Sequence, residues 1–333
     1  MRSILLCNSP RDCDRVYAPQ TLAALAEEAG LEPRCYTKSD ILSTPDAFSD
    51  VQYLFTTWGM PALTEEEIRR CFPNVSALFY AAGSVQAFAR PFLHCGVKVF
   101  SAWTANAVPV AEYTTAQIVL ANKGFFQASA AMSVGDTARA YRCRDSYPGN
   151  FGESVGIIGA GMIGKLVIRL LKHYNLRVLV FDPFLPEDTA RELGVEMCTL
   201  EELFSRCQVI SNHLANNAQT KGMLDGHLFR SMRPYATFLN TGRGAQVVEA
   251  DLAQTLAQRP DLTAVLDVTF PEPPEQGHPF YSLPNCILTP HIAGSSGNEV
   301  HRMSEYMLAE FRALQQGLPC RCEVTEQMLQ TMA

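Results

Sequence analysis

The stretch that decides the fold is "SVGIIGAGMIGKLVIRLL", residues 154–171. A short apolar run leads into a Gly-x-Gly-x-x-Gly pattern formed by Gly159, Gly161 and Gly164, and an amphipathic segment follows. In a strand-turn-helix unit the first glycine permits a tight turn, the second lets a pyrophosphate approach the backbone, and the third lets the helix pack on the strand. The stretch therefore predicts a dinucleotide-binding unit.

The residues that follow the glycines favour one cofactor. The predicted helix begins at Met162 and Ile163, where free backbone amides and the helix dipole would hold the phosphates. The next strand-like run ends at Asp182, where a carboxylate would accept hydrogen bonds from the adenine ribose, although an ordinary turn aspartate is the alternative. A carboxylate repels a 2'-phosphate, and neither Pro183 nor Phe184 supplies a cation, so the sequence favours NAD over NADP.

Outward from this unit, short apolar runs alternate with amphipathic stretches in both directions, which is typical of βαβ units and parallel sheets. We expect an α/β protein with two Rossmann-like domains, in which the cofactor domain is inserted into a flavodoxin-like substrate domain. The predicted substrate (catalytic) domain comprises residues 1–104 plus 296–333, and the predicted NAD-binding Rossmann domain comprises 105–295. A cleft between such domains would be the usual place for a substrate.

Composition excludes several classes of function. The chain has 333 residues, 47% of them hydrophobic and 18% charged, with a net charge of -7 and no basic block, so we expect no nucleic-acid or anionic-membrane partner. No apolar run approaches the roughly 20 residues of a membrane span, and the N-terminus lacks a signal-peptide core. Eleven irregularly spaced cysteines favour reduced thiols in the cytoplasm.

Two features of the sequence leave alternatives open. "PCRC", with Cys320 and Cys322, lacks a second ligand pair, so we expect ordinary tail cysteines and no metal site. Residues 108–126, "VPVAEYTTAQIVLANKGFF", predict a long helix with few charges that is buried between domains or between subunits.

Three polar groups, Arg243, Glu272 and His291, follow strand-like runs on the same side of the expected second sheet, where ligands bind in such folds. A guanidinium can hold a carboxylate bidentately and polarise a neighbouring carbonyl. A histidine can take or give a hydroxyl proton, and a carboxylate on its far nitrogen fixes the tautomer. These are the parts needed to oxidise a hydroxy acid or to reduce a keto acid, with the hydride carried by the cofactor.

In their order and spacing, four segments resemble the NAD-dependent D-isomer-specific 2-hydroxyacid dehydrogenase family, which includes phosphoglycerate dehydrogenase and the glyoxylate and hydroxypyruvate reductases. The segments are "GIIGAGMIG" (156–164), "FLNTGRGAQVVEADL" (238–252), "LDVTFPEPP" (266–274) and "NCILTPHIAG" (285–294). The likeness is strong from about residue 105 to 295 and weaker before it.

The resemblance implies a role for each matching residue. Arg243 corresponds to the substrate-carboxylate arginine, His291 to the acid/base, and Glu272 to its partner. Asp267 would contact the nicotinamide carboxamide, and Thr241 would lie against the nicotinamide. Gly294 would let the backbone pass close to the same ring. The resemblance also implies a homodimer formed through the cofactor domains.

Departures from the family pattern bear on the substrate. Where relatives carry a Gly-Val-Asp-like loop for the substrate carboxylate, this chain has "AAGSVQ" (81–86), which retains Gly83, followed by Ser84, and lacks the aspartate. Upstream, Trp58 and Met60 stand where phosphoglycerate dehydrogenases carry arginines for the phosphate, although both could simply be core residues. We therefore predict a small, non-phosphorylated substrate.

Two further alternatives follow from the same comparison with the family. Residues 215–217, Ala-Asn-Asn, differ from the usual pattern, which leaves the cofactor ribose and phosphate contacts there open, and His213 is expected to be structural. The main functional prediction is an NAD-dependent 2-keto acid reductase. The alternative is an NADH-sensing, co-repressor-like binding protein with the same fold, for which the sequence offers no obvious recruitment surface.

Overall fold

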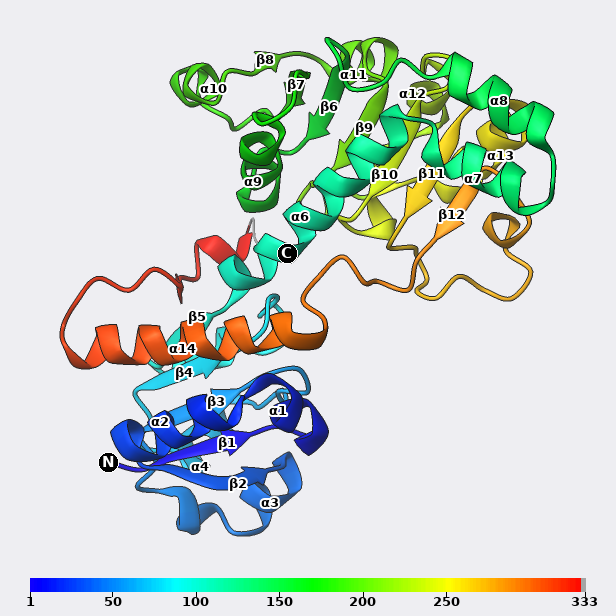
Figure 1. The fold of residues 1–333 in the computed structure, drawn as a ribbon. Helices are drawn as coiled ribbons and strands as arrows, with labels where there is room; N and C mark the ends of the chain where they lie inside the picture. The colour runs from blue at the N-terminus through cyan, green and yellow to red at the C-terminus, as the bar shows by residue number, and fades with distance from the viewer. Residues whose placement is uncertain (331–333) are drawn as a thin grey trace. The chain divides into compact units, whose positions relative to one another are not determined.

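A computed structural model of the protein describes residues 1–330. The chain folds into two compact units, named here unit 1 (Met1–Asn106 with the segment from Ser295) and unit 2 (Ala107–Gly294). Each unit is a largely parallel sheet flanked by helices, so the predicted α/β class is confirmed (Figure 1).

Unit 1 has the strand order β13-β5-β4-β3-β1-β2, in which only β13 is antiparallel. Without β13 this is the 2-1-3-4-5 order of flavodoxin-like folds. Its strands are β1 (Ser3–Leu6), β2 (Leu31–Tyr36), β3 (Tyr53–Thr56), β4 (Ala77–Tyr80), β5 (Lys98–Ser101) and β13 (Glu323–Val324). Its helices are α1 (Pro10–Val16), α2 (Pro19–Ala29), α3 (Lys38–Ser43), α4 (Glu65–Cys71), α5 (Ala89–His94) and α14 (Val300–Gln315).

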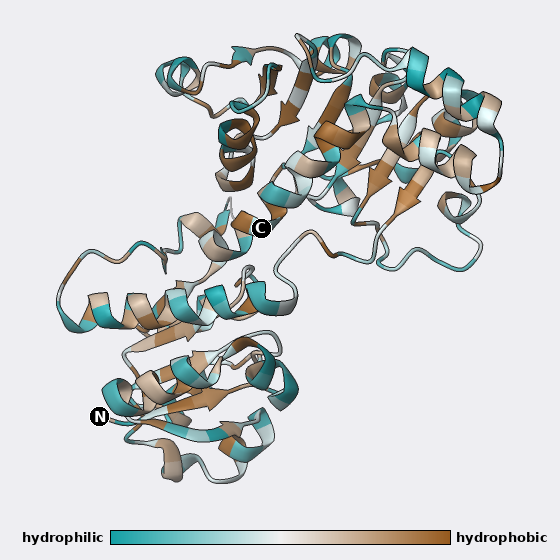
Figure 2. Ribbon diagram, viewed as in Figure 1, coloured by the Kyte–Doolittle hydropathy of each residue, from teal (hydrophilic) through white to brown (hydrophobic). Residues whose placement is uncertain are grey.

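The core of unit 1 is built on stacked aromatic rings. Phe79 in β4 lies between Phe55 and Phe100 of the neighbouring strands, at centroid distances of 5.0 and 4.8 Å. Phe311 of α14 meets the Phe79 ring edge-on at 5.9 Å. Because α14 buries one face and exposes the other, its apolar side covers this sheet, as the alternating brown and teal of Figure 2 shows.

Unit 2 has the order β12-β11-β10-β9-β6-β7-β8, all parallel, which is the doubly wound nucleotide-binding order with one further strand. Its strands are β6 (Ser154–Ile158), β7 (Arg177–Phe181), β8 (Glu196–Met197), β9 (Val209–Asn212), β10 (Thr237–Asn240), β11 (Thr263–Leu266) and β12 (Cys286–Leu288). Its helices are α7 (Phe125–Ser133), α8 (Thr137–Ser146), α9 (Met162–Leu171), α10 (Glu187–Leu193), α11 (Leu200–Arg206), α12 (Gly226–Arg230) and α13 (Glu249–Gln258).

The prediction of a single helix over residues 108–126 is wrong in the limits that it gives. Helix α6 (Trp103–Asn122) begins earlier and ends at Asn122, and α7 begins at Phe125. Gly124 interrupts the helical path with a φ of +65°, and a Cβ placed there would lie 2.3 Å from the Tyr147 ring. The break therefore needs glycine for both its backbone angle and its packing.

Within residues 1–330, none of the helices combines the length and the hydrophobicity that a membrane span requires. Across the same residues, no group of three or more His, Cys, Asp or Glu side chains is arranged to hold a metal ion. Cys322 is buried, and its sulfur lies 3.3 Å from Thr104 Oγ1, while Cys320 is partly exposed.

Candidate active site

The glycine turn after β6 has the geometry that a bound pyrophosphate requires. Gly159 has a φ of +88°, and a Cβ there would lie 2.8 Å from the His213 carbonyl oxygen. A Cβ on Gly164 would lie 2.0 Å from the Gly159 oxygen, so this glycine lets α9 pack on the turn. A Cβ on Gly161 would meet nothing within 4 Å, which leaves that position open for phosphate to approach.

The next two residues begin α9 with different exposures. Met162 is exposed, whereas Ile163 is partly buried and packs against the core of unit 2. Their position at the helix N-terminus, directly after the open glycine, agrees with a phosphate site that uses backbone amides and the helix dipole.

Asp182 follows β7 at the same edge of the sheet and already makes two hydrogen bonds. Its Oδ2 accepts from the Ala160 amide at 2.7 Å, and its Oδ1 accepts from the Phe184 amide at 2.8 Å. These bonds tie the carboxylate to the glycine turn. Each oxygen keeps a second lone pair, so the carboxylate retains the capacity to accept from ribose hydroxyls.

His291 and Glu272 form a hydrogen-bonded pair. Nδ1 of His291 lies 2.7 Å from Oε1 of Glu272, and both side chains are partly exposed. Because a carboxylate can only accept, Nδ1 carries the proton and Nε2 is left to face a ligand. Two residues that lie on either side of β12 in the sequence are thus brought together as a hydrogen-bonded histidine–carboxylate pair.

The backbone of His291 is in an uncommon conformation, with a φ of +54°. Asp267, which is 2% exposed, holds the turn in this state. The Asp267 carboxylate accepts from the amides of Ile292 and Ala293 at 2.8 and 2.9 Å and from the Thr289 hydroxyl at 2.6 Å. The Asp267 carbonyl also accepts from the His291 amide at 3.0 Å. Asp267 therefore fixes the loop that presents His291.

Arg243 follows β10 and is a partly buried cation. Its Nη1 donates to the Gly242 carbonyl at 2.7 Å, and it makes no ion pair with any side chain in residues 1–330. Burial lowers the pKa of Arg243, and the nearby negative charge of Glu272 opposes this effect. A guanidinium that has lost water without gaining a carboxylate partner is a natural point for binding an anionic ligand.

Gly244 joins the arginine turn to the loop that carries Glu272. A Cβ at Gly244 would lie 2.0 Å from the Thr269 carbonyl carbon and 2.5 Å from the Phe270 nitrogen. Strands β10, β11 and β12 are in register, with Asn240 opposite Leu266 and Leu266 opposite Leu288. Arg243, Glu272 and His291 therefore lie in the loops that follow the carboxyl ends of three adjacent strands, as the strand-like runs before them predicted.

Three other residues named from the sequence also lie in unit 2. Thr241 is 9% exposed, and its hydroxyl lies 3.2 Å from that of Thr114 in α6. Gly294 is partly buried and follows the Ala293 amide that Asp267 holds. His213 is buried, with its Nε2 2.9 Å from the Ser211 hydroxyl. Desolvation lowers the pKa of His213 to about 4, which keeps the ring neutral.

Unit 1 brings its own predicted residues to one sheet edge. Trp58 and Met60 follow β3, and Gly83 and Ser84 follow the neighbouring β4. Trp58 and Met60 are partly buried against the core of the unit, whereas Ser84 is exposed. The two loops are tied by the Thr57 hydroxyl, which donates to the Ala81 carbonyl at 2.8 Å.

One side chain at this edge was missed in the sequence. The guanidinium carbon of Arg15 in α1 lies 5.0 Å from the centre of the Trp58 ring, in a cation–π contact. The "TTWGMPALTEEEI" segment (56–68) contains no lysine or arginine, but the fold supplies a cation from elsewhere. No local pattern links residues so far apart in the chain.

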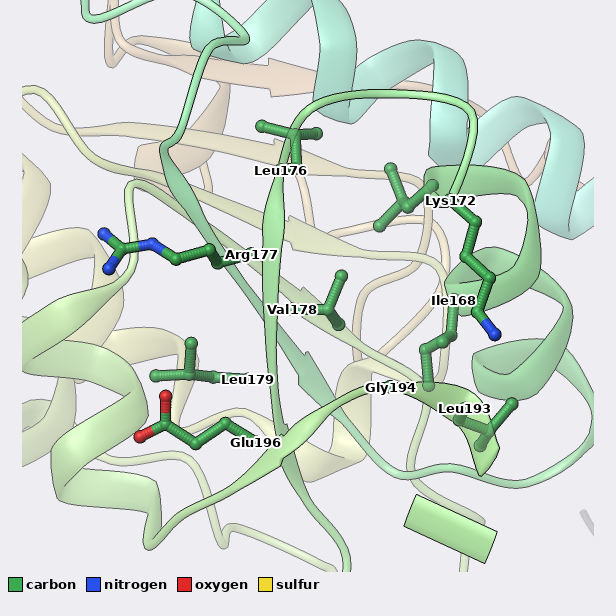
Figure 3. Close-up of a pocket in the computed structure, with 10 residues that line it drawn as sticks. Ile168, Lys172, Leu176, Arg177, Val178, Leu179, Leu193, Gly194 and Glu196 are labelled. Atoms are coloured by element: carbon green, nitrogen blue, oxygen red, sulfur yellow. The ribbon is translucent and has the colours of Figure 1, made fainter. Parts of the chain in front are cut away.

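A surface pocket of about 320 Å³ in unit 2 lies away from these residues. Figure 3 shows Ile168, Val178 and Leu193 along its apolar wall, with Lys172 and Arg177 at its margins. Arg177 begins β7, whereas the glycine turn and Asp182 lie at the carboxyl ends of β6 and β7. None of the residues predicted for the site lines this pocket.

The family follows from comparison with known proteins. Residues 115–293 match the NAD binding domain of D-isomer specific 2-hydroxyacid dehydrogenase. The chain therefore belongs to the D-isomer specific 2-hydroxyacid dehydrogenase family, and NAD is the cofactor of the matched domain. The glycine turn of this chain fits that cofactor, because Gly161 leaves open the place that the pyrophosphate needs.

Individual relatives are similar to this chain over part or nearly all of its length. D-3-phosphoglycerate dehydrogenase of Mycobacterium leprae (strain TN) is 30% identical over 209 residues, which cover 62% of this chain and 38% of the relative. The chain thus spans well under half of that relative's length. A phosphoglycerate oxidoreductase from Rhizobium etli has a TM-score of 0.82 at 24% identity, covering 98% of this chain and 99% of the other.

A second solved structure shows the same fold. The NAD-complexed D-isomer specific 2-hydroxyacid dehydrogenase from Lactobacillus delbrueckii ssp. bulgaricus has a TM-score of 0.79 at 17% identity, covering 98% of this chain and all of that one. At such identities the likeness concerns the fold of the two Rossmann-like domains. It does not extend to the substrate of either protein.

Proposed function

We propose that the protein is an NAD-dependent oxidoreductase that transfers a hydride between the cofactor and a small D-2-hydroxy or 2-keto acid. The observation that carries the proposal is the arrangement at the carboxyl ends of β10 to β12. There, the Arg243 guanidinium, which has no ion-pair partner within residues 1–330, lies at the sheet edge that also carries the hydrogen-bonded His291–Glu272 pair. A cation for a carboxylate and a proton donor for a carbonyl oxygen are the two protein groups that this reaction needs.

Each of these residues has a separate task. Arg243 binds the substrate carboxylate with parallel hydrogen bonds and polarises the adjacent carbonyl. His291, through Nε2, gives a proton to the carbonyl oxygen during reduction or takes it from the hydroxyl during oxidation. Glu272 holds the ring in the productive tautomer and stabilises the positive charge that His291 carries when doubly protonated. Bound NADH supplies the hydride.

The cofactor contacts are part of the same proposal. Asp182 accepts hydrogen bonds from the adenine ribose, and Met162 and Ile163 offer their amides to the phosphates. Thr241, Asp267 and Gly294 border the nicotinamide. Asp267 combines this contact with its role in holding the His291 loop.

We propose that the substrate is not phosphorylated, as in glyoxylate or hydroxypyruvate reduction. The support is the uncharged character of the loop with Trp58 and Met60, and the small Gly83–Ser84 turn beside it offers backbone amides to a carboxylate. Two cations reach this loop from elsewhere in the chain, and both are already engaged. Arg15 stacks on Trp58, whereas Lys38 donates to the Ala62 carbonyl and pairs with Glu67. A phosphate dianion needs several free donors, which these two side chains do not supply.

The test is a panel of 2-keto acids with NADH and NADPH as reductants. We expect NADH oxidation with glyoxylate, hydroxypyruvate or a longer 2-keto acid, and a weaker response with phosphonooxypyruvate. A best rate with phosphonooxypyruvate would overturn the choice of substrate class. Tight NADH binding without turnover across the panel would instead favour an NADH-sensing binding protein.

We further propose that two copies associate through their cofactor domains, in a reducing cytoplasm. The support for the dimer is a run of exposed apolar side chains in and beside α7 and α8. They include Phe125 at 47% exposure, Val134 at 77% and Phe151 at 83%. Light scattering of the wild type and of Val134→Glu would test the dimer, which the variant should weaken.

The support for the reducing compartment is that all eleven cysteines are free.

A further inference from the structure

Gln246, which ends the short 3-10 turn after Arg243, is fully buried, and its side-chain amide joins two segments of the site. Its Oε1 accepts from Asn212 Nδ2 at 2.6 Å and from the Arg243 backbone amide at 3.2 Å. Its Nε2 donates to the carbonyls of Leu214 and Ala215 at 2.8 and 3.0 Å. An amide has two acceptor sites and two N–H donors, so its capacity is used completely.

The orientation of this amide follows from its neighbours. Backbone carbonyls can only accept, so the nitrogen of Gln246 must face Leu214 and Ala215. The oxygen then faces the Arg243 amide, which can only donate. No exchange of oxygen and nitrogen would satisfy the same four partners.

Two further buried amides complete the network around Arg243. Asn212 Nδ2 also donates to Asn240 Oδ1 at 3.0 Å, and Asn240 Nδ2 donates to the Arg243 carbonyl at 3.2 Å. Asn212 and Asn240 are at most 1% exposed. The backbone N–H and C=O of Arg243 are therefore both held by side chains that water does not reach.

The other end of the network packs against the cofactor turn. The His213 amide donates to the Ile158 carbonyl at 2.7 Å, directly before Gly159. A Cβ on Gly159 would lie 2.8 Å from the His213 oxygen and 3.1 Å from the Leu214 nitrogen. The segment 213–215, to which Gln246 is hydrogen-bonded, thus packs against the glycine turn.

We propose that Gln246 is a positioning residue that ties the dinucleotide turn to the arginine that binds the substrate carboxylate. The inference rests on the proposed function, because it takes Arg243 as the carboxylate ligand. One buried amide holds the Arg243 backbone through its oxygen and the 214–215 segment through its nitrogen. Because this position is fully buried, removing one of these hydrogen bonds leaves a buried polar group unsatisfied and destabilises the protein by the desolvation free energy of that group.

The experiment separates the two ends of the amide with two variants. Gln246→Met, of similar shape, removes all four bonds, and we expect the Kd of NADH and the Kd of oxamate to rise about tenfold each. Oxamate is an unreactive 2-keto acid analogue and is titrated into the NADH complex. Gln246→Glu keeps an acceptor toward Arg243 and replaces the two N–H donors with at most one O–H, so the Kd of NADH should rise while that of oxamate changes by less than about threefold.

A matched control comes from another buried glutamine of unit 2. Gln208 is 3% exposed and donates to the Tyr235 carbonyl at 2.6 Å, outside the site. Gln208→Met should lower the Tm without changing either affinity. If Gln246→Met behaves like this control, Gln246 is merely structural and the proposal is wrong.

The remaining outcomes also decide the question. If Gln246→Met does not fold, Gln246→Glu carries the test, and an unchanged NADH affinity in that variant overturns the proposal. Failure of the proposed function looks different: wild-type protein would bind NADH but neither bind oxamate nor reduce any 2-keto acid. The NADH measurements on the variants would still report on the link to the glycine turn.

Discussion

Nδ1 of His291 lies 2.7 Å from Oε1 of Glu272, on a backbone whose φ at His291 is +54°. Asp267 holds the loop that carries His291, because its carboxylate accepts hydrogen bonds from the two backbone amides that follow this residue. A strained residue that the surrounding hydrogen bonds over-determine is a common feature of catalytic loops. The orientation of the ring is therefore set before any substrate arrives.

Replacing His291, the proposed acid/base, should abolish turnover and leave cofactor binding intact. We expect His291→Gln to lower kcat by about 100-fold or more, because proton transfer to the carbonyl oxygen is lost. The Kd of NADH, measured by fluorescence, should stay within about threefold of wild type. His227→Gln, on an exposed position of α12, is the control and should retain full activity. Loss of NADH binding in His291→Gln would show that the residue serves the cofactor instead.

The choice of cofactor should depend on Asp182. Asp182→Ala removes the carboxylate that would bind ribose hydroxyls and repel a 2'-phosphate, so the KM for NADH should rise about tenfold and that for NADPH should rise less. Steady-state kinetics with both cofactors measure the ratio. Asp188→Ala, on the exposed surface of α10, should change neither KM. Equal effects of Asp182→Ala on the two cofactors would contradict the NAD preference.

Two glycines should respond oppositely to the same added methyl group. Gly244→Ala places a Cβ against Thr269, so we expect a loss of about 2 kcal/mol in the free energy of unfolding and a lower Tm. Gly161→Ala meets no protein atom within 4 Å, so its Tm should be unchanged while its affinity for NADH falls. Thermal melts and NADH titrations of both variants distinguish the two effects. Normal NADH binding by Gly161→Ala would remove this glycine from the cofactor site.

Stability should depend on pH through His213. Its folded-state pKa of about 4 lies below the value of about 6.5 expected in the unfolded chain, so between these values the unfolded state binds more protons. Stability therefore rises with pH across this window and is lost as pH falls, by about 3 kcal/mol in total.

Chemical denaturation at pH 7.5 and pH 4.5 tests this dependence. His213→Asn cannot titrate, so its pH dependence should be flatter than that of wild type. His173→Gln alters a histidine that is exposed in unit 2 and should follow the wild-type curve. Parallel curves for wild type and His213→Asn would refute the assignment.

Arg15 offers a way to test the substrate class. Arg15→Gln removes the cation beside Trp58, and we expect kcat/KM for hydroxypyruvate to change by less than about threefold. The remaining activity with phosphonooxypyruvate should fall more, because a phosphate gains most from a guanidinium. Arg11→Gln on the same helix is the matched control. A large loss with hydroxypyruvate would mean that Arg15 has a general role in the site.

Much of unit 2 was predictable because its signals are local. The runs that form β6, β7 and β9 to β12 are short, apolar and bounded by turn residues, and the glycine pattern lies at a single strand-helix junction. Strand β2 carries a weaker signal, because it is an edge strand containing Glu32, Pro33 and Arg34, which interrupt the apolar pattern. The split between α6 and α7 was missed although Gly124, a local signal for the end of a helix, lies at the break.

The same contrast between local signals and contacts of distant residues applies to the candidate site. The positions of Arg243, Glu272 and His291 after successive strands were predictable, because each residue stands in its own motif after a strand. The stacking of Arg15 on Trp58 and the amide network of Gln246 join residues that are tens of positions apart. Such contacts arise from tertiary packing, which no spacing rule in the sequence expresses.

The position of α14 has a consequence for the order of folding during synthesis. All strands of unit 2 lie within one continuous stretch, Ala107–Gly294, and can pair as soon as that stretch has left the ribosome. In unit 1, by contrast, the rings of Phe55 and Phe79 can make their edge-on contacts with Phe311 only after α14 has been synthesised. Unit 1 therefore completes its core only after the whole of unit 2 has been translated, so its strands wait for a helix that lies beyond the inserted unit in the sequence.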